Sequence, residues 1–355
     1  MKANPKMVTL AREVRGISQT QLADLIDNLS QGNLSRMEKG ILTITDEILQ
    51  SMATVLNFPL NFFYQEEVKT PISNFYYRKR VTMPKKAILL LEAKMNIIRK
   101  SIDYLLESIE IPDCNIPSFD IEGYTDKKRY AAEVARRIRA FMKISAGPID
   151  DLIGIFENHG ILVHFIGSVH EKFDGITLFS DKGQPIIFIN KDMPNDRKRF
   201  TLAHELGHLV LHIPFVLDLD RDEEAEANIF SAEFNMPELD VRNDLYHLNM
   251  SKLGQLKDYW KMSKAAIIYR AKNIGVLNDQ KYKYLNIELS RRGERKKETG
   301  SVELREPRLL KEILTAYQQQ LGYSLVEISE LLKIGLSDLN ELFFPDNQRL
   351  RIVRV

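Results

Sequence analysis

Apolar residues recur every three or four positions in short stretches of residues 1–65, and turn-forming residues separate these stretches. The stretch "SQTQLADLI" begins with a serine that can cap a helix, and it places Leu22, Leu25 and Ile26 on one face. The stretch "SQGNLSRMEKG" begins in the same way and ends at Gly40, where a helix C-terminus favours glycine. With "TDEILQSMATVLN" the helical spacing continues. We therefore expect residues 1–65 to form an all-α domain of about five short helices.

The pattern of residues 66–126 predicts a helical connector between the N-terminal domain and the rest of the chain. The segment "AILLLEAKMNIIRKSIDYLLESI" has the spacing of one long amphipathic helix, suited to a connector or a dimer strut, and "IPDCNIPSFDIEGYTD" is a proline-punctuated loop. Residues 78–100 are strongly basic, with Glu92 as their one acid. Such a run is usually a solvated helix face and less often a polyanion site. Its basic residues are Arg78, Lys79, Arg80, Lys85, Lys86, Lys94, Arg99 and Lys100.

The pattern changes at residue 127. Two helical segments, "KKRYAAEVARRIRAFMKI" and "GPIDDLIGIFENHG", precede three short apolar runs, "ILVHFI", "GITLFS" and "QPIIFIN". Turn residues separate these runs, which predicts a small sheet of about three strands. A long apolar helix follows at once. We expect an α+β domain over residues 127–290 and an α-helical C-terminal region over residues 291–355.

Composition narrows the class of protein. The chain has 355 residues, 44% of them apolar, which suffices for two or three domain cores. Because no window approaches twenty uninterrupted apolar residues, and the N-terminus has no export signal, we expect a cytoplasmic protein without a membrane span. Cys114 is the single cysteine, which excludes an internal disulfide framework. The net charge of +1 indicates no class of partner.

Candidate chemistry lies in "RFTLAHELGHLVLH". His204 and His208 are four residues apart, so a helix presents both imidazoles on one face, close enough to chelate one ion. Glu205 lies beside them, where it can polarise a water molecule without being a ligand. The flanking residues are mostly apolar, and buried polar groups in such a helix need a partner. A divalent cation would supply it.

The motif HExxH is short enough to occur by chance, so a third ligand decides the question, because hydrolytic zinc sites use three protein ligands. The segment 222–237, "DEEAEANIFSAEFNMP", is helical in pattern. Within it, Glu224 shares a stripe with Asn228, whereas Glu223 and Glu226 point about 100° and about 200° away. We therefore take Glu224 as the third ligand, with Glu223 and Glu226 as reserves. The alternative is an amphipathic helix with solvated glutamates.

The stretch "ISQTQLADLI…LSQGNLSRMEKG" resembles the XRE, or lambda-repressor-like, helix-turn-helix family. The resemblance implies that the helix from Gln31 enters the DNA major groove. It also implies base or phosphate contacts from Gln31, Asn33 and Arg36, with Gln19 at a helix N-terminus near phosphate. This sequence departs from the family in its turn, Asp27–Asn28–Leu29, which is one residue longer and has no glycine.

The charge of this segment leaves a second role open. Residues 1–65 contain six basic and six acidic residues, whereas a DNA-binding domain usually carries a basic surface. A helix-turn-helix used for dimerisation or protein contact is the alternative to a DNA reader.

The segments "GPIDDLIGIFENHGILVHFI", "DGITLFS", "PIIFIN", "RKRFTLAHELGHLVLH" and "EEAEANIFSAEFNMP", in this order, resemble the ImmA/IrrE metallopeptidase family over residues 127–240. The resemblance implies a gluzincin-like site in which His204, His208 and Glu224 bind Zn²⁺ and Glu205 is the general base. His212 is then an outer-shell or packing residue. Members of the family are cytoplasmic, and several cleave a helix-turn-helix repressor. The segment "LGQLKDYWKMSKAAIIYRAKNIGVL" scans like another helix-turn-helix, but the resemblance favours a scaffold role for it.

Other predictions concern the surroundings of this site. The strand "QPIIFIN" is a candidate for pairing with an extended substrate. Candidate transition-state acids are His164, His170, Tyr246 and His247, although each also suits packing or the surface. The C-terminal region could close over the site or mediate dimerisation.

Together these features predict a cytoplasmic zinc-dependent endopeptidase fused to a DNA-binding helix-turn-helix. Its substrate would be a regulatory protein, such as a helix-turn-helix repressor or an antitoxin-like protein, in a stress or mobile-element response. Its other partners would be double-stranded DNA and a second copy of the chain, with no membrane. The alternative is an XRE-type transcriptional regulator whose metallopeptidase-fold domain senses a ligand or partner without cleaving it.

Overall fold

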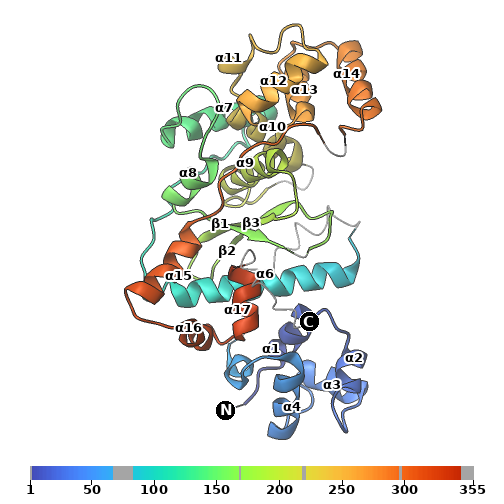
Figure 1. The fold of residues 1–355 in the computed structure, drawn as a ribbon, viewed down its shortest axis with the longest axis vertical. Coiled ribbons are helices and arrows are strands. Elements are labelled where there is room, and N and C mark those ends of the chain that lie inside the picture. Colours follow the sequence, from blue (N-terminus) through green and yellow to red (C-terminus); the bar gives the residue numbers. More distant parts are fainter. Residues whose placement is uncertain (1, 67–82, 168, 218–220, 296–297, 345–355) are drawn as a thin grey trace, which may run out of the picture.

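The computed structural model describes residues 2–66, 83–167, 169–217, 221–295 and 298–344. Arg78, Lys79 and Arg80 of the basic run lie outside these residues. Helical layers enclose a small sheet, with the N-terminal domain at one end of the molecule (Figure 1). Among the described residues, no helix combines the length and apolar character needed to cross a bilayer.

The N-terminal domain consists of short helices around one apolar core. Their starts follow from side-chain caps: Ser18 and Gln21 form a reciprocal capping box, and Ser30 accepts from the backbone of Asn33. The longer turn closes without glycine because Asn28 adopts φ 60°, a left-handed conformation that asparagine tolerates well. The elements are α1 (Pro5–Val14), α2 (Gln19–Asp24), α3 (Gln31–Glu38), α4 (Asp46–Leu56) and the 3₁₀ helix η1 (Leu60–Tyr64).

Within the described residues the sheet has three strands, as predicted, in the order β1-β3-β2. β3 (Pro185–Asn190) pairs with β1 (Leu162–Ile166) in parallel and with β2 (Gly175–Phe179) in antiparallel fashion. β3 is therefore the middle strand, with a partner on each side. The prediction that "QPIIFIN" pairs with an extended substrate is wrong, because its backbone groups already form two ladders. The edges of the sheet are β1 and β2.

Alternate strand residues point to opposite faces of the sheet, and each face has its own helical layer (Figure 1). Val163 and Ile187 share a core with α7 (Lys127–Phe141), α8 (Leu152–Asn158), α9 (Asn195–Leu211) and α10 (Glu223–Asn235). Leu162 and Phe188 share the opposite core with α6 (Lys85–Leu105), α15 (Leu309–Gln319) and α17 (Leu336–Phe343). α6 is the long helix that the spacing of its apolar residues predicts.

A third core lies beyond α10. It surrounds Trp260, which is 2% exposed and donates to Asp244 Oδ2 at 3.0 Å. Its helices are α11 (Glu238–Val241), α12 (Met250–Trp260), α13 (Lys264–Asn273) and α14 (Asp279–Arg291).

The C-terminal helices return to the N-terminal domain (Figure 1). Arg15 Nη2 donates to Asp338 Oδ2 at 2.8 Å, and Asn57 Nδ2 donates to Ser337 Oγ at 3.1 Å. α15, α16 (Leu325–Leu331) and α17 thus lie across the sheet from α9. For the helices of residues 309–343, the prediction that the tail closes over the HExxH site is wrong, because their apolar residues complete the opposite core.

Candidate metal centre

The candidate site lies between α9 and α10, which pack closely against each other. A Cβ added at Gly207 of α9 would lie 3.1 Å from the Phe230 ring of α10. Ser231 Oγ of α10 donates to the Phe200 carbonyl of α9 at 2.7 Å. Because small residues occupy this contact, the backbones approach and a carboxylate from α10 can reach the imidazoles on α9.

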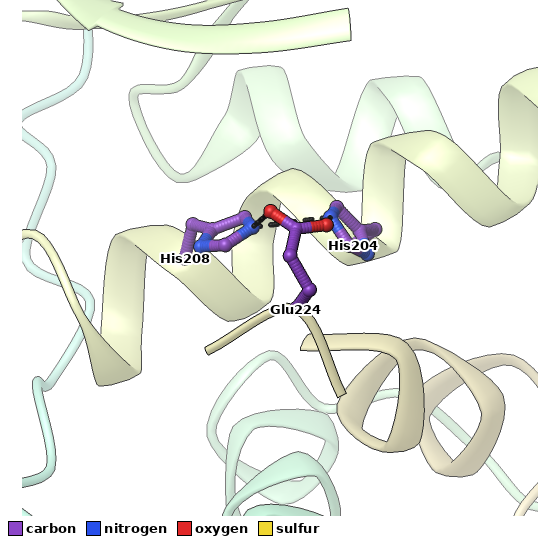
Figure 2. A group of neighbouring side chains, drawn as sticks. All are labelled: His204, His208 and Glu224. Carbon is purple, nitrogen blue, oxygen red and sulfur yellow. Dashed lines mark hydrogen bonds and ion pairs between the residues drawn. The ribbon is translucent and has the colours of Figure 1, made fainter. Parts of the chain in front are cut away.

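His204, His208 and Glu224 converge on one point. The Nε2 atoms of the two histidines are 3.1 Å apart. That of His204 lies 3.5 Å from Glu224 Oε2, and that of His208 lies 3.5 Å from Glu224 Oε1. One ligand atom from each residue lies within 4.8 Å of the others. Figure 2 shows the Glu224 carboxylate between the two rings. The structure therefore brings together the three residues that the sequence predicts as ligands.

The donor set fits a tetrahedral cation. Donors at about 2.0–2.1 Å from a tetrahedral zinc ion would be about 3.3 Å apart. The two imidazole nitrogens, 3.1 Å apart, and the 3.5 Å from each of them to its nearer Glu224 oxygen lie close to that value, although each nitrogen faces a different oxygen of the carboxylate. Two imidazole nitrogens that face each other at this distance need a proton or a cation between them. Two neutral imidazoles and one carboxylate are a usual donor set for zinc.

Burial and contacts tune the three groups differently. Burial lowers the pKa of His208 to about 4, which keeps its imidazole in the neutral form that binds metals. Burial also acts to lower the pKa of His204, but its contacts with Glu224 and the nearby Glu205 outweigh this and raise it. Hydrogen bonds from His204 and His208 lower the pKa of Glu224. Because the Glu224 side chain is 46% exposed, the cluster opens towards solvent.

The two reserve carboxylates occupy other positions. Glu226 is buried and contacts His212 Nε2 at 3.0 Å and Arg221 Nη2 at 2.9 Å. Glu223 is also buried and forms a second group of potential ligands with His208 and His212. Both groups of potential ligands contain His208, so the second group lies directly beside the first.

Glu205 lies buried beside the sheet, 4% exposed. Thr177 Oγ1 on β2 donates to Glu205 Oε2 at 2.9 Å and lies 3.3 Å from the Glu205 carbonyl oxygen. Sequence reasoning missed Thr177. The available signal was a lone hydroxyl in the apolar run "GITLF". This run begins at Gly175, two residues before Thr177, where an added Cβ would lie 2.8 Å from Thr201 of α9.

Of the four candidate acids, His164 is the one buried in a core. It lies on β1, on the sheet face opposite α9, with its ring centroid 6.1 Å from that of Phe343 in α17. Burial lowers its pKa to about 4. His164 is therefore a neutral packing residue and lies away from the metal ligands.

The predicted DNA-contacting residues lie on α2 and α3. Gln31, Asn33 and Arg36 are exposed. Gln31 Nε2 donates to Gln19 Oε1 at 2.9 Å, and Gln19 Nε2 donates to Glu38 Oε2 at 2.7 Å. These bonds join the N-termini of the two helices and fix the orientation of both glutamines.

Comparison with known proteins identifies two domains in the chain. Residues 156–272 match the IrrE N-terminal-like domain, a peptidase family model, and residues 10–63 match a helix-turn-helix model. The chain thus contains an XRE-type helix-turn-helix domain and an IrrE N-terminal-like domain. The match to the IrrE N-terminal-like domain extends through α12 and most of α13, which favours a scaffold role for that helix pair.

A curated relative gives a weaker similarity. A UDP-N-acetylglucosamine–peptide N-acetylglucosaminyltransferase GtfA subunit from Streptococcus parasanguinis is 25% identical over 145 residues. The alignment spans 40% of this chain and 28% of that subunit, so the chain covers little more than a quarter of it.

Proposed function

We propose that this protein is a cytoplasmic zinc-dependent endopeptidase that carries its own DNA-binding helix-turn-helix domain. The proposal rests on one observation: His204 and His208, on the helix that also bears Glu205, converge with Glu224 of α10, and one ligand atom of each residue lies within 4.8 Å of the others. The proposed substrate is a regulatory protein, either a helix-turn-helix repressor or an antitoxin-like protein. This substrate class follows from the family resemblance.

The residues of the site divide the chemistry between them. His204, His208 and Glu224 would hold the ion in a gluzincin-like arrangement. When bound, zinc would supply Lewis-acid chemistry that polarises a peptide carbonyl and acidifies a water molecule. Glu205 would accept the proton of that water at a carboxylate oxygen and deliver it to the departing amine. Thr177, which already donates to Glu205 Oε2, would hold the carboxylate in position.

The N-terminal domain supports a DNA partner. The exposed side chains of Gln31, Asn33 and Arg36 lie on the first two turns of α3. In this class of domain, the corresponding helix enters the major groove. Gln19, at the start of α2, would lie near a phosphate.

The test combines mass spectrometry with Glu205→Gln. We expect the wild-type protein, loaded with zinc, to cleave a candidate helix-turn-helix regulator at a defined peptide bond. The variant should retain its metal, because Glu205 is not a ligand, and should cleave at least about 100-fold more slowly. Equal cleavage by the two proteins would contradict the assignment of Glu205.

One observation favours a second function, that of a transcriptional regulator whose peptidase-like domain is a sensor. The Arg15–Asp338 ion pair links the helix-turn-helix domain to α17, which packs against the sheet below α9. A sensor needs such a connection, whereas a free peptidase does not. If Glu205→Gln retains its metal and also leaves the response of a target promoter unchanged, the sensor function is supported and the peptidase function is not.

A further inference from the structure

We infer that His212, Glu226 and Arg221 form a hydrogen-bonded chain that orients the His208 imidazole for metal binding. The inference rests on the proposed metal site and assigns it three positioning residues. His208 Nδ1 lies 2.9 Å from His212 Nδ1, and His212 Nε2 lies 3.0 Å from Glu226 Oε2. Arg221 donates to the same Glu226 oxygen from Nε at 3.0 Å and from Nη2 at 2.9 Å.

The position of one proton fixes the direction of every bond in this chain. His208 Nε2 faces His204 and Glu224, so as a ligand it carries no proton and Nδ1 must carry it. His208 Nδ1 then donates to His212 Nδ1, which leaves the proton of His212 on Nε2. That proton is donated to the Glu226 carboxylate, whose remaining partner is the guanidinium of Arg221. Each contact thus joins one donor to one acceptor.

The chain is built into the protein interior. His212 is 3% exposed and Glu226 is 2% exposed, and the Arg221 side chain is fully buried. A buried carboxylate is costly unless it is paired and hydrogen-bonded, and here the guanidinium and the imidazole satisfy one of its oxygens together. Arg221 also donates to Glu122 Oε2 at 3.1 Å, which anchors the far end of the chain.

The two proposed histidine ligands have separate supports. His204 Nδ1 lies 3.1 Å from Asn228 Oδ1, a neutral acceptor one helical turn beyond Glu224. His208 relies on His212 instead. Outer-shell acceptors fix the tautomer and the orientation of ligand histidines, and their loss typically lowers metal affinity by about 10–100-fold. Removing the acceptor of one ligand histidine should therefore leave the orientation of the other ligand histidine unchanged.

The test measures metal affinity and the cobalt spectrum, so that it does not depend on peptidase activity. His212→Leu removes the acceptor and should weaken Zn²⁺ binding, measured by chelator competition, by about 10–100-fold. Its Co²⁺ complex should show shifted visible absorption bands. His212→Asn keeps an oxygen acceptor near the position of Nδ1 and should restore most of the affinity and the wild-type bands. Glu226→Gln, which removes the charge at the end of the same path, should lose about 10-fold in affinity.

His164→Leu is the matched control, because it removes an equally buried histidine on the far face of the sheet. It should leave the affinity and the cobalt spectrum unchanged. Wild-type affinity and spectrum in both His212→Leu and Glu226→Gln would overturn the inference but leave the proposed function standing. Equal losses in His212→Asn and His212→Leu would also overturn it, because the acceptor would then not matter. A wild-type protein that binds no zinc would instead overturn the proposed function.

Discussion

At the scale of single residues, the position of the Glu205 carboxylate depends on a hydroxyl group from the sheet. Thr177 Oγ1 donates to Glu205 Oε2 at 2.9 Å. We expect Thr177→Val, which has nearly the same shape, to lower the cleavage rate by about 10-fold or more, because the base loses its orientation. Metal content should stay at the wild-type level, and Thr177→Ser should restore most of the rate. A Thr177→Val protein with the wild-type rate would contradict this role.

His164 makes the stability of the protein depend on pH. Burial holds its pKa at about 4 in the folded state, against about 6.5 when unfolded. Between these two pH values, the unfolded chain binds more protons than the folded protein. The stability that the neutral His164 allows is therefore fully present above about pH 6.5 and is lost as the pH falls towards 4. When the pH is lowered from 7.5 to 5, His164 should reduce the free energy of unfolding by about 2 kcal/mol.

Urea unfolding of the wild type and of His164→Leu at the two pH values checks this expectation. The free energy of unfolding of the variant should fall by about 2 kcal/mol less between pH 7.5 and pH 5 than that of the wild type. An identical fall in the two proteins would show that His164 is not a buried neutral group.

At the scale of elements, the site depends on how closely α9 and α10 approach. Gly207→Ala would place a methyl group 3.1 Å from the ring of Phe230, which is fully buried on α10 and would have to give by a few tenths of an ångström. We expect part of this displacement to reach the backbone of α10, which carries Glu224. We expect weaker metal binding and a net loss of stability, because overpacking costs about 1–3 kcal/mol against a gain of about 1 kcal/mol in helix propensity. Thermal unfolding and chelator competition measure the two effects.

Gly254→Ala provides the matched control. Gly254 lies in α12 with nothing within 4 Å of an added Cβ. This substitution should raise the stability by about 0.5–1 kcal/mol and leave metal binding unchanged. If Gly207→Ala were stabilising to the same degree, with unchanged metal binding, close packing of the two helices would not control the site.

The sequence predicts the residues of the site that follow from helical spacing within α9 or within α10, and it misses those that depend on how strands and helices pack. The four-residue spacing of His204 and His208 fixes their common face, and helical angles select Glu224 over its neighbours. Thr177 reaches Glu205 through a strand–helix contact across 28 residues, which no local period indicates. β3 resembles the other apolar runs in composition, so its place in the middle of the sheet could not be read from it.

At the scale of the whole molecule, the sheet separates the proposed chemistry from the DNA-binding domain, and α17 connects them. Asp338 pairs with Arg15 and is only 8% exposed, and it lies in the first turn of α17, where a negative charge is favourable. We expect Asp338→Ala to lower the stability by about 1–3 kcal/mol and to increase hydrogen exchange in α15–α17.

Glu341→Ala is the control for that substitution. Glu341 lies on α17, like Asp338, and pairs with Lys94 of α6. Because the Glu341 side chain is 59% exposed, loss of this ion pair should change the free energy of unfolding by less than about 1 kcal/mol. Equal and small effects of the two substitutions would mean that α17 does not hold the N-terminal domain in place.

Zinc analysis of three purified proteins shows whether His204, His208 and Glu224 together bind one divalent cation. The wild type and Glu223→Ala should each hold about one tightly bound zinc ion, because Glu223 belongs only to the alternative ligand group. Glu224→Ala should lose tight binding, because two histidines remain where hydrolytic sites use three protein ligands. Zinc missing from the wild type, or retained by Glu224→Ala and lost from Glu223→Ala, would mean that these three residues do not hold the ion.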